Sequence, residues 1–175
     1  IEVNMKSLFL FFIVTLIFIS CKPETKVYPD VAVDQIGKTL LWDMSYVQVK
    51  KILTEDFNLD FAKEIEQSQK NPIGKVYEFD GGKFNGVESK SWVVILENDS
   101  LKVLTINIEN GNPQRILEFQ KQLQNILVPD TNSSSNENRW LVMNNGNTIS
   151  EVQILTQPEN KGIVVTYFKP FRKKY

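Results

Sequence analysis

Hydrophobic and polar residues follow two different periods along the chain, and the change of period separates helices from strands. The first helical segment opens at a capping box, in which Ser45 is followed three residues later by Gln48. We expect a helix from Tyr46 to about Leu53, with its inward face formed by Val49, Ile52 and Leu53. Residues 57–68 fit two alternatives, because Phe57, Phe61 and Ile65 recur at helical spacing while residues 57–61 alternate as in a strand.

A second helix is indicated where a capping residue, Asn112, precedes a proline at the first helical position. Apolar residues recur at helical spacing after it and stop before Pro129. The predicted apolar face consists of Ile116, Phe119, Leu123, Ile126 and Leu127.

Most other segments of the chain alternate with a period of two and are rich in β-branched and aromatic residues, which is typical of strands. The predicted strands cover residues 76–79, 83–88, 91–97, 101–108, 140–143, 149–156 and 162–168. Short turn sequences separate them, and Asn145-Gly146 is the hairpin signal that we weight most. The pattern therefore predicts antiparallel hairpins in a meander.

The order of these elements predicts an α+β fold, in which helices pack on an antiparallel sheet. Helix and strands are followed by helix and strands again, and Trp92 and Trp140 stand at similar places in the two halves. This order also permits a tandem repeat of helix plus β-meander. Residues 130–139 form a polar, low-complexity stretch and are predicted to be a loop.

The N-terminal segment has the layout of a secretion signal. Met5 and Lys6 precede an apolar run over residues 8–19, and Ser20 and Cys21 follow it. The run is shorter than a typical membrane span. We expect residues 1–20 to be a signal peptide, with Met5 as the initiator and residues 1–4 upstream of the true start.

The sequence Phe18-Ile19-Ser20-Cys21 resembles the lipobox of bacterial lipoproteins, with Phe18 where that family usually has leucine. The resemblance implies a lipid on Cys21 and an envelope protein anchored to the outer membrane. It divides the mature chain into a tether at residues 21–34 and one α+β domain at residues 35–175. Lys22 and Glu24 are similar to the surface-export signal of Bacteroidota lipoproteins, so the periplasmic side and the cell surface both stay open.

The element order is also similar to that of small periplasmic inhibitor and assembly-factor lipoproteins, in which a helix packs on an antiparallel sheet, sometimes in tandem. Residues 44–50, Met-Ser-Tyr-Val-Gln-Val-Lys, resemble the helix-opening segment of small outer-membrane assembly lipoproteins. This resemblance implies an envelope protein as partner.

Composition excludes several classes of chemistry. Histidine is absent and cysteine occurs once, so neither an imidazole base nor a thiolate zinc cage is available. The formal net charge of −1 argues against binding to nucleic acid. We expect no cofactor and no metal.

The remaining motifs give little support to catalysis. Gly37-Lys38-Thr39 looks like the end of a phosphate-binding loop, but Ala32 replaces the glycine that such a loop needs. Glu78, Asp80, Glu88 and Glu97 lie on the predicted sheet, without a spacing that selects a catalytic pair.

Three aromatic residues are candidates for a binding surface because their rings offer large apolar area: Trp42, Trp92 and Trp140. The sequence thus favours a non-catalytic, protein-binding lipoprotein of assembly, inhibitor or immunity type. The alternative is a small carboxylate-dependent hydrolase or a glycan-binding lipoprotein of the envelope.

Overall fold

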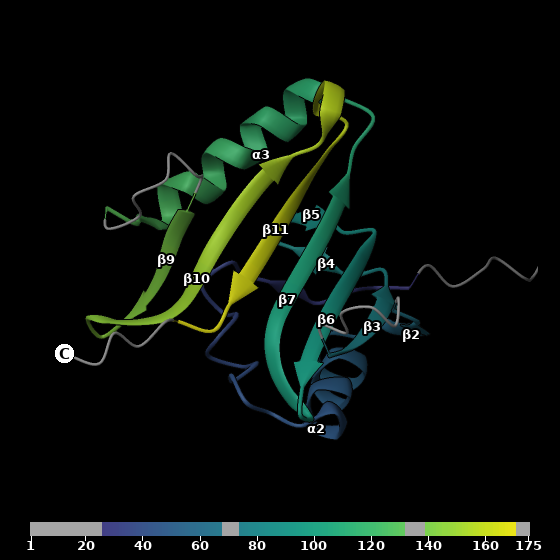
Figure 1. Ribbon diagram of the computed structural model, residues 1–175. Coiled ribbons are helices and arrows are strands. Elements are labelled where there is room, and N and C mark those ends of the chain that lie inside the picture. Colours follow the sequence, from purple (N-terminus) through teal and green to yellow (C-terminus); the bar gives the residue numbers. More distant parts are fainter. Residues whose placement is uncertain (1–25, 68–73, 132–138, 171–175) are drawn as a thin grey trace, which may run out of the picture.

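The computed structural model describes residues 26–67, 74–131 and 139–170, and a large antiparallel sheet dominates them (Figure 1). Its strands are β2 (Asp60–Ile65), β3 (Lys75–Asp80), β6 (Ser91–Glu97), β7 (Ser100–Glu109), β8 (Val128–Pro129), β9 (Arg139–Asn144), β10 (Asn147–Thr156) and β11 (Gly162–Phe168). A second, small sheet contains β1 (Asp30–Val31), β4 (Lys83–Phe84) and β5 (Val87–Glu88). The helical segments are α2 (Tyr46–Lys51), its π-helical continuation η1 (Ile52–Asp56), α3 (Pro113–Ile126) and the short η2 (Pro158–Asn160).

The strand order of the eight-stranded sheet is β2-β3-β6-β7-β11-β10-β9-β8. Each half is a helix followed by four antiparallel strands, and the last strands of the two halves, β7 and β11, pair at the centre. The α+β prediction is confirmed in this broad form, although helices make up a small part of the fold.

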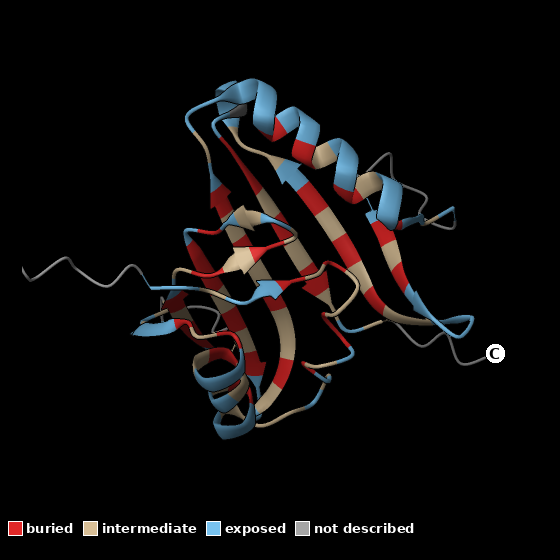
Figure 2. Cartoon of the chain, turned by 180° about the vertical axis from the view of Figure 1, so that it is seen from behind, coloured by how far each residue is buried: buried red, intermediate tan, exposed pale blue. Residues whose placement is uncertain are grey.

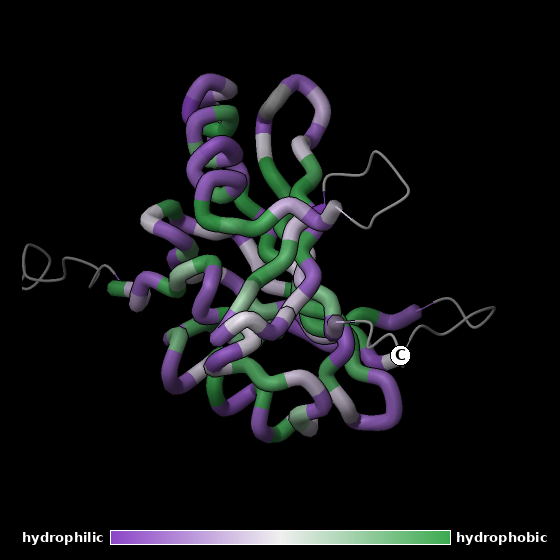
Figure 3. Tube along the Cα trace, turned by 90° about the vertical axis from the view of Figure 1, so that its left-hand side faces the viewer, coloured by the Kyte–Doolittle hydropathy of each residue, from purple (hydrophilic) through white to green (hydrophobic). Residues whose placement is uncertain are grey.

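One face of the large sheet carries both helices and the small sheet (Figure 2). Side chains alternate between the two faces of each strand, and the hydropathy of the chain alternates with them (Figure 3). The inward set is almost entirely apolar, and its largest fully buried members include Trp92, Tyr167, Phe79 and Phe84. The core therefore lies between this face and the elements that cover it.

Local signals placed the helix starts correctly. The Ser45 backbone N–H donates to Gln48 Oε1 over 3.0 Å, which completes the predicted capping box. The Asn112 side chain accepts a hydrogen bond from the Gln114 backbone N–H over 3.0 Å, with Pro113 as the first helical residue.

The predicted apolar face of α3 is wrong at one residue. Ile116, Phe119 and Leu123 are buried, whereas Ile126 is 49% exposed. The helix ends at Ile126, and Leu127 has an extended backbone that turns its own side chain into the core. Packing at this end therefore passes from the helix to Leu127.

Two hairpins were predicted from sequence and are confirmed. Asn98-Asp99 joins β6 to β7, and Asn145-Gly146 joins β9 to β10. All four residues have positive φ, between 49° and 77°. Such turns match the right-handed twist of the paired strands.

The predicted single strand at residues 83–88 is wrong. The structure forms the hairpin β4–β5 there, because Asn85-Gly86 is a second asparagine-glycine turn, with φ values of 47° and 85°. The ambiguity at residues 57–68 is resolved for the part that the structure describes. Helical structure ends at Asp56, and Asp60–Ile65 is an edge strand.

The predicted tether at residues 21–34 extends too far. Asp30 and Val31 pair with β4, and Val31 and Val33 are 2% and 0% exposed. The packed domain therefore begins before residue 35. The predicted signal peptide, Cys21 and most of the predicted loop at 130–139 lie outside the described residues.

The two tryptophans compared between the halves are not equivalent in the sheet. Trp92 lies in β6, the third strand of the first half, and Trp140 lies in β9, the second strand of the other half. The expected equivalence of these two residues is therefore wrong.

Gly82 provides a test of the packing around Trp92. Its φ is +103°, and an added Cβ would lie 2.6 Å from Leu59 Cδ2 and 2.7 Å from Trp92 Nε1. Gly82→Ala should lower the free energy of unfolding by about 2–4 kcal/mol, through backbone strain and overpacking. Gly111→Ala is the matched control, because a Cβ there meets no atom within 4 Å, and it should change stability by less than about 1 kcal/mol. Urea denaturation measures both, and equal losses would contradict this account of the core.

Candidate binding surface

The second face of the large sheet carries no helix and no strand in the described parts of the chain (Figure 1). The strand register places one residue from each of the eight strands in a single row across this open face. The row is Ile65, Val76, Ile95, Val103, Phe168, Glu151, Leu141 and Val128. We call it the apolar row, since Glu151 is its one charged member.

Most side chains of the apolar row are half-buried by their neighbours on the sheet. Val76 is 9% exposed, yet it stands apart from the main core cluster because it points to the open face. The row is therefore an apolar band at the surface whose side chains are partly covered by their neighbours on the sheet.

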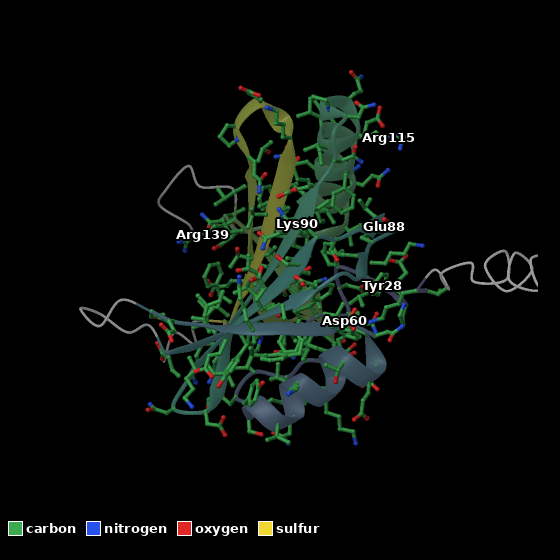
Figure 4. The ribbon with its side chains drawn as sticks, turned by 90° about the vertical axis from the view of Figure 1, so that its right-hand side faces the viewer. Tyr28, Asp60, Glu88, Lys90, Arg115 and Arg139 are labelled. Atoms are coloured by element: carbon green, nitrogen blue, oxygen red, sulfur yellow. The ribbon has the colours of Figure 1, made fainter. Side chains whose placement is uncertain are left out.

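The next row of the open face is mainly polar. The register aligns Lys63, Glu78, Val93, Thr105, Thr166, Gln153 and Arg139. Lys63 forms an ion pair with Glu78 over 3.2 Å, and the hydroxyls of Thr105 and Thr166 lie 3.3 Å apart. Seen close to edge-on, Arg139 lies on the side of the sheet away from Arg115 and Glu88 (Figure 4). The open face thus combines an apolar band with a polar one.

A groove of about 950 Å³ adjoins the apolar row at Phe168 and Glu151. Strands β10 and β11 and the segment around residues 37–43 contribute most of its walls. Its lining residues are Gly37, Leu41, Trp42, Asp43, Glu97, Lys102, Arg139, Thr148, Ile149, Glu151, Val152, Gln153, Phe168, Lys169 and Pro170.

Hydrogen bonds fix the wall of the groove that precedes α2. Trp42 Nε1 donates to the Ile149 carbonyl oxygen over 2.6 Å, across 107 residues of sequence. The Asp43 backbone N–H donates to the Leu101 carbonyl oxygen over 3.2 Å. These contacts hold the segment against β10 and the start of β7.

Asp43 lies at the centre of an ion cluster in the groove. Lys102 Nζ contacts Asp43 Oδ1 over 2.5 Å, and Lys169 Nζ contacts Asp43 Oδ2. Asp43 has φ of 72°, a left-handed conformation that aspartate and asparagine tolerate better than most residues. The cluster joins the segment before α2 to the ends of β7 and β11.

The two lysines set the protonation state of this carboxylate. Hydrogen bonds from Lys102 and then Lys169 lower the pKa of Asp43 below its ordinary value of 3.8. A general acid needs a raised pKa, so Asp43 is suited to accept hydrogen bonds and not to donate a proton.

Of the three tryptophans expected at a binding surface, the structure places one there. Trp42 is half-buried and lines the groove. Trp92 is fully buried with its Nε1 donating to Ser89 Oγ over 2.7 Å, and Trp140 is 9% exposed. The rings of Trp92 and Trp140 belong to the core, because both side chains point to the covered face.

The four acids weighed for hydrolysis do not converge on one site. Glu78 and Asp80 lie on β3, Glu88 belongs to the small sheet on the opposite face, and Glu97 lies at the groove. Lys38 of the phosphate-loop-like sequence forms an ion pair with Asp34 over 2.8 Å. Among the described residues, no group of three or more acidic or cysteine side chains is placed to hold a metal ion.

The sequence did not predict that Asp43, Lys102 and Lys169 form an ion cluster, or that Phe168 lies beside it. Lys102 and Lys169 lie 59 and 126 residues from Asp43 in sequence, so local patterns could not join them. Trp42, next to Asp43, is the tryptophan candidate from the sequence that lies in this groove.

Comparisons of the chain with protein-family models, curated proteins and solved structures gave no significant match. Within residues 26–67, 74–131 and 139–170, none of the helices has the length and hydrophobicity of a membrane span.

The ion cluster makes a prediction about stability and pH. Asp43→Asn should lower the free energy of unfolding at pH 7 by at most about 1 kcal/mol, because both ion pairs are solvent-exposed and screened. Because the pKa of Asp43 is lower in the folded state, ionised Asp43 stabilises the fold at pH values above its unfolded-state pKa of 3.8. This stabilisation is lost as the pH falls through the folded-state pKa. Urea denaturation from pH 7 to pH 2.5 should therefore show the two proteins converging on acidification. A difference that widens in acid would refute this role.

Proposed function

We propose that this chain is a lipid-anchored lipoprotein of the cell envelope that binds a protein partner without catalysing a reaction. The observation that carries the proposal is the open face of the eight-stranded sheet, with its apolar row of seven hydrophobic residues and Glu151. Apolar side chains that gather at the surface and are bordered by polar ones often mark protein interaction sites.

The covered face explains why the open face is available for a partner. Both helices and the small sheet pack on the same side, where they bury Trp92, Phe84 and Tyr167. Antiparallel sheets commonly leave one face to solvent, but that face is then mostly polar. Here Ile95, Val103 and Phe168 interrupt the polar pattern at the centre of the sheet.

We also propose that the two halves are a tandem repeat, each made of a helix and a four-stranded meander, and this arrangement supports the same function. Joining two repeats through β7 and β11 doubles the width of the sheet and gives one continuous face. The predicted resemblance to inhibitor and assembly lipoproteins, which include tandem forms, agrees with this arrangement.

The anchor part of the proposal rests on the sequence around Cys21. The apolar run and the lipobox-like residues 18–21 favour lipid attachment at Cys21, and the short segment between this lipid and Asp30 would hold the domain close to a membrane. Attachment at the surface of a membrane suits a protein whose partner also resides in the envelope.

Partner binding is tested by a bulky charge at the centre of the open face. Thr166→Arg should abolish stoichiometric co-purification of an envelope protein with the full-length chain, because the arginine would fill the contact surface. Val47→Arg is the matched control, since Val47 is 73% exposed on α2, and it should leave co-purification unchanged. Co-purification that is equally strong with both variants would refute the open face as the contact surface.

Lipid attachment is tested at the mature N-terminus. Intact-mass spectrometry of the protein from its native envelope should show a chain that begins at a diacylated or triacylated Cys21. Cys21→Ser should move the protein from the membrane fraction to the soluble or unprocessed fraction. An unmodified Cys21 in an uncleaved chain would refute the anchor.

A further inference from the structure

The ion cluster in the groove has two cations and one anion. Each oxygen of the Asp43 carboxylate faces a different lysine, Lys102 on one side and Lys169 on the other. Neither lysine forms an ion pair with a second acid among the described residues. An ammonium group has three donors, so each lysine keeps donors beyond the one directed at Asp43.

The cluster is accessible from solvent. The side chains of Lys102, Asp43 and Lys169 are 30%, 46% and 41% exposed. The backbone also brings the two lysines together, because the Lys169 N–H donates to the Lys102 carbonyl oxygen over 3.3 Å. A second carboxylate could therefore reach both ammonium groups and balance their charge.

The positive excess is local to the two lysines, because Glu97, Glu151 and Arg139 also line the groove and balance its charge as a whole. Apolar side chains lie along the same groove. Leu41 is 50% exposed, and Trp42, Phe168 and Pro170 are half-buried along the same groove. A ligand that fits both features carries a carboxylate next to a large apolar group.

We propose that the groove binds an acidic segment of a protein partner, in which a glutamate or aspartate lies between Lys102 and Lys169 and a neighbouring apolar side chain packs on Trp42 and Phe168. This inference rests on the proposed function and names the chemistry of the partner. The apolar row continues from Phe168, so one partner could contact the groove and the open face together.

The test uses two capped pentapeptides, acetyl-Gly-Phe-Glu-Leu-Gly-amide and the same peptide with glutamine in place of glutamate. Trp42 lines the groove while Trp92 and Trp140 are buried in the core, so a change in tryptophan fluorescence on addition of peptide reports mainly on this site. We expect saturable binding of the glutamate peptide in the millimolar range or tighter, and about threefold to tenfold weaker binding of the glutamine peptide. Equal binding of the two peptides, or binding of neither, would overturn the proposal.

Substitutions test the roles of the lysines and of Asp43 separately. Lys102→Met with Lys169→Met should remove the preference for the glutamate peptide. Asp43→Asn should strengthen glutamate-peptide binding about twofold to fivefold, because the ligand then supplies the only carboxylate for both lysines. Lys121→Met, on the exposed side of α3, removes a lysine charge outside the groove; it is the control and should leave binding unchanged. Weaker binding in Asp43→Asn would overturn the proposal, and the peptide pair on the unaltered protein tests it even if a variant fails to fold.

Failure of this inference is distinguishable from failure of the proposed function. If Thr166→Arg abolishes co-purification of an envelope partner while the two peptides bind equally, the groove proposal falls and the open face stands. If the peptides differ as expected but no partner co-purifies, the ligand chemistry of the groove is supported and the proposed function falls.

Discussion

The packing of Phe84 is the constraint on which the rest of the structure depends. Its ring is fully buried and contacts the rings of Trp92, Phe119 and Tyr167 edge to face, with centroids 6.1, 6.3 and 6.3 Å away. Trp92 lies in the first half of the sheet and Tyr167 in the second, whereas Phe119 lies on α3. Edge-to-face contacts add to the burial of apolar area. One residue on a two-residue strand therefore joins both halves and α3 to the small sheet.

This arrangement decides which face of the sheet remains open. The small sheet exists because β4 pairs with β1, and the Tyr167 hydroxyl donates to the Val33 carbonyl oxygen over 3.0 Å, which ties the N-terminal segment to the centre of the large sheet. All covering elements converge on the side where Phe84 lies. The opposite side keeps its apolar row at the surface, and the proposed interaction surface is thus a consequence of a one-sided core.

Local elements could be predicted from the sequence, and their long-range partners could not. The capping box at Ser45 and the turn at Asn145-Gly146 depend on a few neighbouring residues, so both predictions are confirmed. The sequence pattern assigns Val31 to the tether, because nothing beside it in sequence shows that β4 pairs with it. The sequence alone does not separate Trp92 and Trp140 from Trp42, because composition does not reveal which face of a strand a side chain occupies.

The candidate site combines features of both kinds. The apolar row follows from strand alternation once the register is known, yet the register of β7 with β11 joins segments far apart in the chain, and residues 103 and 168 meet only there. The ion cluster needs the same pairing, because it brings Lys102 beside Lys169. The central β7–β11 pair therefore joins the two halves, aligns the apolar row and assembles the charged groove. A change that shifted this register by one residue would move every side chain of β11 to the other face and remove all three.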